Sequence, residues 1–131
     1  MLAKITVADY MTKHLVKLSP DMNVIDAIQR ILDHKITGAP VIDAQGKVIG
    51  VFTERDGIKV VLEAAYNQSG TGKVAEFMTD QVVHVEAETS IVDLAEKFQG
   101  SSVRSFPVYK DKNLVGIISR TDVLRALTSN A

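Results

Sequence analysis

The sequence contains no cysteine and no tryptophan, and the absence of cysteine excludes several kinds of site. Without cysteine the chain can form no disulfide, no thiolate metal site and no cysteine nucleophile. Aromatic residues are few, with 4 phenylalanines and 3 tyrosines, so aliphatic side chains must fill most of the core. Hydrophobic residues make up 46% of the 131-residue chain, which is typical of a globular protein with a well-filled interior.

Neither sign of charge is in excess. The net charge of −1 argues against a surface dedicated to nucleic acid, which would need clustered lysine and arginine. The first residues, Met1–Ile5, lack the apolar stretch of a signal peptide, and no apolar run approaches the length that spans a membrane. We therefore expect a cytoplasmic protein that binds neither nucleic acid nor membranes.

Groups that could bind a metal or perform catalysis are sparse. His14, His34 and His84 show no pairing one helical turn apart, so we predict no metal site. The sequence contains no nucleophile elbow and no H-E-x-x-H motif. Because no general base with a supporting group can be named, we predict no catalytic residues and no enzyme activity. A nucleotide hydrolase is the disfavoured alternative, and product formation from bound nucleotide would reveal it.

What the chain does contain is an internal repeat. Val7–Thr12 returns as Val74–Thr79 at an offset of 67 (74 minus 7), and Gly50 returns as Gly116 at an offset of 66. Each repeat is shorter than 65 residues and could bury only about 60% of its unfolded surface alone. We therefore expect the two repeats to share one core and to pack about a pseudo-twofold axis.

Both repeats show the same order of predicted elements. Apolar residues at helical spacing follow a good N-cap, Asn23 in the first copy and Ser90 in the second. A β-hairpin and a second helix come next, and a short strand precedes each first helix, at residues 15–18 and 82–85. The sequence predicts an α+β fold of two β-α-β-β-α repeats, at residues 7–66 and 74–128, joined by a glycine-rich linker at 67–73.

A short polar motif stands where each hairpin runs into its second helix, as Thr53-Glu54-Arg55-Asp56 and as Ser119-Arg120-Thr121-Asp122. A hydroxyl residue followed three places later by a carboxylate is typical of a capping box. The box prefers Glu or Gln at the last place, however, and both copies have the shorter Asp. Such a carboxylate can instead accept two hydrogen bonds from a ribose diol, beside helix amides that can bind an anion. Both interpretations stay open.

The repeated order of elements, the apolar residue before Pro-Val, and the pattern G-h-h-[ST]-x-x-D (h apolar) at residues 50–56 and 116–122 resemble a tandem pair of CBS domains, or Bateman module. The family is named after cystathionine beta-synthase. The resemblance covers about Val7 to Leu127 and leaves little for another domain. It implies a regulatory sensor of adenosine ligands that needs no cofactor and signals to an unidentified protein partner. AMP is the favoured ligand, with ADP and ATP as alternatives.

The resemblance also implies which residues bind the nucleotide in two clefts between the repeats. In similar modules the Asp holds the ribose hydroxyls, the Ser or Thr lies near ribose or phosphate, and apolar backbone encloses adenine. One cleft would use Asp122, Ser119 and the segment Val103, Arg104, Ser105, with Val16, Ile36 and Thr37 from the other copy. The second would use Asp56, Thr53 and Val83 with the same two segments before the prolines.

The two clefts are expected to be unequal. Arg104 matches a place where related modules have a phosphate-binding basic residue, whereas Thr37 takes that place in the first copy. Arg120 beside Ser119 could add to a phosphate site, while Glu54 would repel one. We therefore favour the cleft of Asp122, although Arg104 and Arg120 could equally be ordinary surface residues.

Apolar stripes on the second helices predict a homodimer. They comprise Ile58, Val61, Leu62, Ala65 and Tyr66 in the first copy, and Val123, Leu124 and Leu127 in the second. A core of this size does not need all of them, and related modules pair through such helices. The alternative function is a ligand-free structural or interaction module whose Thr53, Asp56, Ser119 and Asp122 are caps only. Thermal stabilisation by a ligand separates the two.

Overall fold

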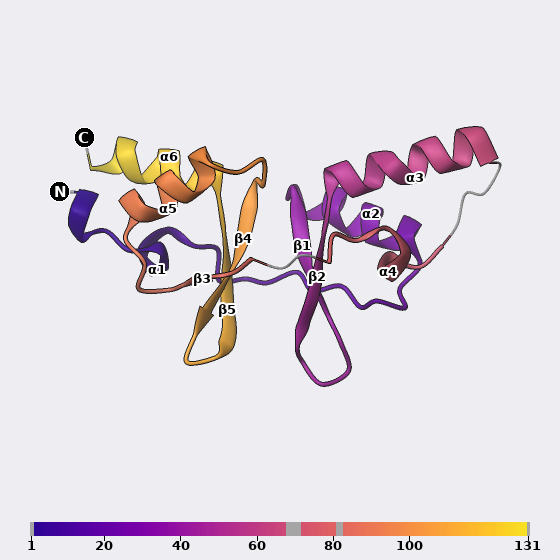
Figure 1. Ribbon diagram of the computed structural model, residues 1–131, viewed down its shortest axis with the longest axis horizontal. Helices are drawn as coiled ribbons and strands as arrows, with labels where there is room; N and C mark the ends of the chain where they lie inside the picture. Colours follow the sequence, from indigo (N-terminus) through magenta and orange to yellow (C-terminus); the bar gives the residue numbers. More distant parts are fainter. Residues whose placement is uncertain (1, 68–71, 81–82, 131) are drawn as a thin grey trace. The chain divides into compact units, whose positions relative to one another are not determined.

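A short helix, a longer helix, a β-hairpin and a further helix follow one another twice along the chain, with one additional short strand in the second copy (Figure 1). The computed structural model describes residues 2–67, 72–80 and 83–130. The helices are a 3-10 turn at Leu2–Lys4, α1 (Val7–Tyr10), α2 (Val24–His34), α3 (Glu54–Asn67), α4 (Val74–Phe77), α5 (Ile91–Gln99) and α6 (Arg120–Ser129). The strands are β1 (Gly38–Ile42), β2 (Val48–Thr53), β3 (Val85–Glu86), β4 (Ser105–Lys110) and β5 (Asn113–Ser119). The α+β fold class predicted from the sequence is confirmed.

The chain divides into two units that do not coincide with the sequence repeats. Unit one comprises Met1–Leu15 together with Val83–Ala131, and unit two comprises Val16–Val82. Helix α1, from the first repeat, packs against α6 of unit one, whereas α4, from the second repeat, packs against α2, α3 and β2 of unit two. Each unit is therefore the hairpin and two longer helices of one repeat, completed by the opening segment of the other. Most of the predicted linker, residues 68–71, lies outside the described residues.

The exchanged segments attach to their units by matching backbone hydrogen bonds. In unit one, Thr12 donates its amide to the carbonyl of Ile117 at 2.8 Å and accepts the Ile117 amide at 3.0 Å. In unit two, Thr79 makes the same reciprocal pair with Val51, both at 2.9 Å. The two hairpins therefore each gain a partner from the repeat to which they do not belong.

Two glycines permit this close approach. A Cβ atom at Gly116 would lie 2.7 Å from the sulfur of Met11 and 2.8 Å from the carbonyl oxygen of Thr12. At Gly50 the corresponding distances, to Met78 and to the Thr79 carbonyl oxygen, would be 2.6 and 2.9 Å. The glycine that begins each G-h-h-[ST]-x-x-D motif is thus required by the contact with the exchanged segment.

The sheets are small and centre on the hairpins. Strands β1 and β2 are antiparallel in unit two, and unit one has the order β3-β4-β5, with β3 parallel to β4 and β4 antiparallel to β5. The prediction of a strand at residues 15–18 was wrong, because of these residues only Leu18 forms a bridge, to Val41. Of the strand expected at 82–85, residue 82 lies outside the described chain and β3 begins at Val85.

The predicted caps of the first helices are confirmed. The Asn23 side chain accepts the amide of Ile25 at 2.8 Å, and the Ser90 hydroxyl accepts the amide of Asp93 at 3.0 Å. Helix α2 ends where Lys35 takes the left-handed conformation, with φ of 54°. Ile36 therefore lies beyond the helix, although it still packs against the core of unit two.

Each unit has its own hydrophobic cluster, so the single shared core expected from the sequence was wrong. In unit one, Leu94, Phe106 and Ile118 are among the buried residues, and the rings of Phe98 and Phe106 lie 4.8 Å apart. In unit two, buried side chains surround Phe52. The exchange of α1 and α4 explains the difference, because each buries its valine, Val7 or Val74, in the unit that it joins.

Candidate functional site

The Asp56 carboxylate lies at the start of α3 and is almost completely buried, with 1% of the residue exposed. One oxygen, Oδ2, accepts the backbone amide of Thr53 at 2.9 Å and its hydroxyl at 3.1 Å. The amide of Asp56 in turn donates to the Thr53 hydroxyl at 3.3 Å. These reciprocal bonds are those of a capping box, so the cap predicted from the sequence is present.

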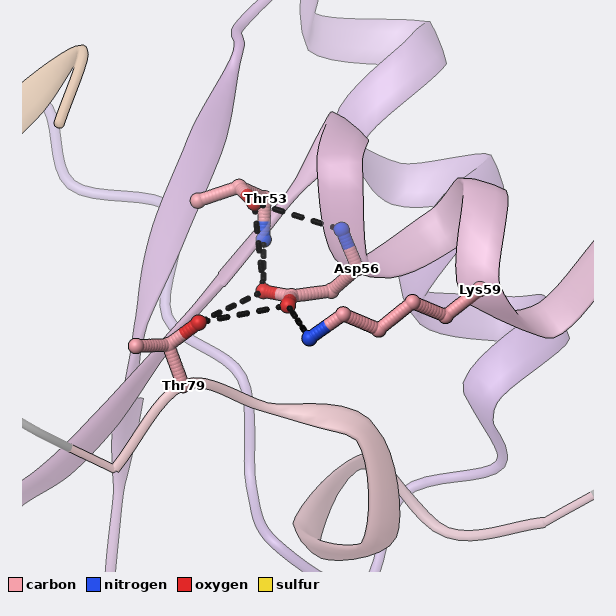
Figure 2. A network of polar contacts seen from close by, with 4 residues as sticks. All are labelled: Thr53, Asp56, Lys59 and Thr79. Atoms are coloured by element: carbon pink, nitrogen blue, oxygen red, sulfur yellow. Dashed lines mark hydrogen bonds and ion pairs between the residues drawn. The ribbon is translucent and has the colours of Figure 1, made fainter. Parts of the chain in front are cut away.

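The other oxygen of Asp56 is held by two side chains (Figure 2). Lys59, three residues further along α3, places its Nζ atom 3.2 Å from Oδ1. The hydroxyl of Thr79, on the exchanged segment, donates to Oδ1 at 3.2 Å and lies 3.5 Å from Oδ2. We call Thr53, Asp56, Lys59 and Thr79 the Asp56 half-site. Oδ2 is held mainly by the cap, and Oδ1 by a cation and a hydroxyl.

The Asp122 carboxylate at the start of α6 repeats this arrangement in unit one. The amide and hydroxyl of Ser119 donate to Oδ2 at 2.9 and 3.0 Å, and the Asp122 amide donates to the hydroxyl at 3.3 Å. Arg125 takes the place of Lys59 and donates to Oδ1 at 2.6 Å. We call Ser119, Asp122 and Arg125 the Asp122 half-site. Within the described chain, Thr12 makes no hydrogen bond to Asp122, although its backbone matches that of Thr79.

The two arginines predicted to contact phosphate, Arg104 and Arg120, have different surroundings in the structure. The backbone carbonyls of Thr37 and Arg104 accept the first amides of α3 and α6, those of Glu54 at 2.9 Å and Arg120 at 3.0 Å. The Arg104 side chain is exposed, and no ion pair or hydrogen bond among the described residues uses it. Arg104 therefore lies beside the start of α6 with its side chain exposed.

Arg120 is engaged with its own unit. Its guanidinium donates to the carbonyl oxygens of Val103 at 3.0 Å and Phe98 at 3.2 Å, and also to that of Ser101. It lies 5.7 Å from the centre of the Phe98 ring, within range of a cation–π contact. These contacts hold the segment between α5 and β4, which is a structural role that the sequence did not indicate.

The other residues predicted to line the nucleotide clefts are divided between the two units. In unit one, Ser105 is buried and lies opposite Ser119 in the β4–β5 ladder, while Val83 and Val103 are exposed. In unit two, Val16 and Ile36 are partly buried against the core. Unit one thus brings together Ser105, Ser119, Arg120 and Asp122, and unit two brings together Thr37, Thr53 and Asp56.

Three side chains of the half-sites were missed from the sequence. Lys59 and Arg125 each follow their Asp by three residues, a spacing at which helical side chains meet, so this signal was available. Thr79 had only a weak signal, the repeated Met-Thr pair, because its contact depends on the exchange of segments.

The described residues offer neither a cluster of metal ligands nor a membrane-spanning helix. No group of three or more His, Asp or Glu side chains is arranged to hold a metal ion. None of the described helices is long and apolar enough to cross a membrane. Unit two has a pocket of about 460 Å³ between α3 and α4, and Lys59, Glu63, Tyr66 and Glu76 are among its lining residues.

Comparisons with known proteins agree on the family to which the chain is similar. The family model described as the CBS domain matches residues 7–63 and 74–129. Inosine-5'-monophosphate dehydrogenase of Methanocaldococcus jannaschii is 32% identical over 114 residues, which cover 86% of this chain but only 22% of that enzyme.

Solved structures are similar over almost the full length of both chains. A CBS-domain containing protein of Agrobacterium tumefaciens is 33% identical with a TM-score of 0.85, and the match covers 95% of this chain and 94% of that one. CBSX2 of Arabidopsis thaliana, solved in complex with AMP, is 30% identical with a TM-score of 0.82, and the match covers 96% and 98%.

Proposed function

The chain belongs to the CBS domain family, and on that premise we propose that it is a regulatory module that binds an adenine nucleotide through its two half-sites. One observation carries the proposal: a buried carboxylate occurs twice in the same setting, with one oxygen used by the helix cap and the other held by side chains that can move away. That second oxygen is the acceptor offered to a ribose diol. The AMP complex of a protein 30% identical to this chain supports the choice of ligand.

AMP is the first ligand that we propose, with ADP and ATP as alternatives. Arg104 supplies unit one with an exposed guanidinium, a group well suited to phosphate, whereas Thr37 supplies no charge to unit two. We therefore expect the phosphate to contact Arg104 and the Asp122 half-site to be the stronger one. Arg120 supports it indirectly, since it is occupied with holding the backbone before β4.

We propose no chemistry for this site. The half-sites contain carboxylates, hydroxyls and cations, and each carboxylate is already bound by the helix cap and the cation of its own unit, so we assign no general base to it. A sensor acts only if its ligand binds two states with different affinity. We therefore expect the two states to differ in the binding of a partner protein or of a second copy of this chain.

AMP is expected to stabilise the protein against heat. A ligand at 100 times its dissociation constant adds about 2.7 kcal/mol to the free energy of unfolding. Differential scanning calorimetry measures the shift in melting temperature. The matched control is 2'-deoxy-AMP, because it lacks one of the two hydroxyls that would donate to the Asp carboxylate. If AMP, ADP, ATP and S-adenosylmethionine at millimolar concentration all leave both the melting temperature and calorimetric heats unchanged, the ligand-free alternative is correct.

The second helices present apolar side chains to solvent, which supports a homodimer. Ile58, Val61, Leu62 and Tyr66 of α3 are exposed, as are Leu124 and Leu127 of α6. Helix α3 buries only Asp56 and Val60, so most of its apolar residues are available to a partner. Exposed apolar patches of this kind are typical of protein interaction surfaces.

Leu124→Lys is expected to weaken the dimer, because it places a charge in the proposed contact. Leu32→Lys is the matched control, since Leu32 on α2 has the same exposed fraction as Leu124, 64%. Sedimentation equilibrium at tens of micromolar, with and without AMP, measures both. A single species near 14.3 kDa for the unmodified chain would contradict the dimer.

A further inference from the structure

Each half-site contains a cation of its own, one helical turn after the Asp. Lys59 lies 3.2 Å from Oδ1 of Asp56, and Arg125 lies 2.6 Å from Oδ1 of Asp122. We propose that Lys59 and Arg125 are internal competitors of the ligand, which must displace them to reach the carboxylate, and that Arg125 is the stronger competitor. This competition rests on the proposed function, and it explains what limits the affinity of each half-site for AMP.

The number of acceptor positions on a carboxylate explains the competition. Two oxygens offer about four lone pairs, and the cap already uses two of them through the amide and hydroxyl of Thr53 or Ser119. A ribose diol donates two more hydrogen bonds. Both can be accepted only if Oδ1 is released, by Lys59 and Thr79 in one half-site and by Arg125 in the other.

The cations are free to leave, whereas the carboxylates are not. The side chains of Lys59 and Arg125 are 56% and 55% exposed, while those of their Asp partners are 1% and 7% exposed. A displaced cation therefore regains water at little cost, and the buried carboxylate exchanges one donor for another. Figure 2 shows this arrangement for Lys59, whose side chain runs from α3 to the carboxylate.

The two cations differ in how firmly they hold the oxygen. Arg125 makes a short, charge-assisted hydrogen bond, and Asp122 is the only acidic residue on α6. Lys59 makes a longer contact and has other acidic neighbours, because Glu63 and Glu76 line the pocket between α3 and α4 that Lys59 also lines. Removing Arg125 should therefore raise the affinity for AMP more than removing Lys59, since Thr79 still donates to Asp56 after Lys59 is gone.

Other roles for these cations predict the opposite change in AMP affinity when the cation is removed. If Arg125 only held Asp122 in position, or bound the phosphate of the nucleotide, its removal would weaken AMP binding. Competition predicts tighter binding together with a slightly less stable free protein. The direction of the change in affinity thus separates the explanations.

The experiment is AMP titration calorimetry on variants in which one half-site works alone. Arg125→Met is made in the Asp56→Ala background, and Lys59→Met in the Asp122→Ala background. Methionine keeps most of the apolar stem of either side chain but cannot donate a hydrogen bond. We expect Arg125→Met to tighten AMP binding by roughly three- to fivefold and Lys59→Met by about twofold or less, as for partly exposed ion pairs. Arg55→Met is the control for loss of a positive charge, since Arg55 lies in the first turn of α3 and is exposed.

Unchanged or weaker AMP binding by Arg125→Met overturns the inference while leaving the proposed function in place. An equal gain for Arg55→Met also overturns it, because the effect would then belong to net charge. If AMP binds neither the unmodified chain nor any variant, the proposed function fails and this inference with it. Melting temperatures of all variants show whether each one is folded at the temperature of the titration.

Discussion

Gly116→Ala is expected to destabilise the protein by roughly 1–3 kcal/mol, the usual cost of forcing extra volume into a packed contact. The added Cβ would lie 2.8 Å from the carbonyl oxygen of Thr12, and this oxygen accepts the amide of Ile117. The backbone of the exchanged segment would have to move and would weaken that pair of hydrogen bonds. Gly50→Ala should act in the same way on Thr79, whose hydroxyl also contacts Asp56. Urea denaturation measures both.

Gly57→Ala is the control for this prediction. Gly57 lies inside α3, and a Cβ there would meet Ile28 at 3.6 Å, an ordinary van der Waals distance. Alanine in a helix is favoured over glycine by about 0.5–1 kcal/mol, so this variant should be more stable than the unmodified chain. Loss of stability in Gly57→Ala, or none in Gly116→Ala, would show that the contact with the exchanged segment does not require glycine.

Asp122→Ala is expected to reduce AMP affinity at its half-site about ten- to hundredfold, the range for loss of hydrogen bonds to a charged acceptor. It also removes the carboxylate half of the capping box of α6, while the Ser119 cap stays, and should cost about 1 kcal/mol of stability. Asp56→Ala should have the same effects in unit two, with a smaller loss of total binding, since Arg104 belongs to unit one. Titration calorimetry gives the affinity, and thermal melting without ligand gives the stability.

Asp93→Ala controls for the loss of an acidic residue in the first turn of a helix. Asp93 has the same place in α5 that Asp122 has in α6, but its side chain is exposed and makes no hydrogen bond within the described residues. AMP affinity should be unchanged in this variant. Should Asp56→Ala abolish binding while Asp122→Ala leaves it intact, the expected order of the two half-sites would be reversed.

Local features of the fold could be predicted from the sequence because their signals are local. The caps at Asn23 and Ser90 and the hairpin that ends at Thr53 each depend on residues within a few positions of one another. The cap at Ser119 and Asp122 was predicted for the same reason. The short strand before α2 was not formed, since strand pairing depends on a distant partner and only Leu18 finds one.

The exchange of α1 and α4 could not be predicted from repeat boundaries. A repeat in sequence shows which residues are equivalent, but either copy of Val7–Thr12 could have joined either hairpin, because the two hairpins present equivalent glycines. The contact of Thr79 with Asp56 follows from that exchange and was missed with it. Arg120 was interpreted from its neighbour Ser119, whereas its contacts are with backbone carbonyls about 20 residues earlier in the chain.

The exchange also determines when each unit becomes complete during translation. Unit two is one continuous stretch, Val16–Val82, and all its parts have been synthesised before the second hairpin exists. Unit one joins Met1–Leu15 to the much later residues Val83–Ala131, and Asn130 donates to the hydroxyl of Tyr10 at 2.9 Å. A nascent chain therefore carries Val7 without its native partners until the second hairpin and α6 have been synthesised. The opening segment is the part of this protein most dependent on protection while it is being made.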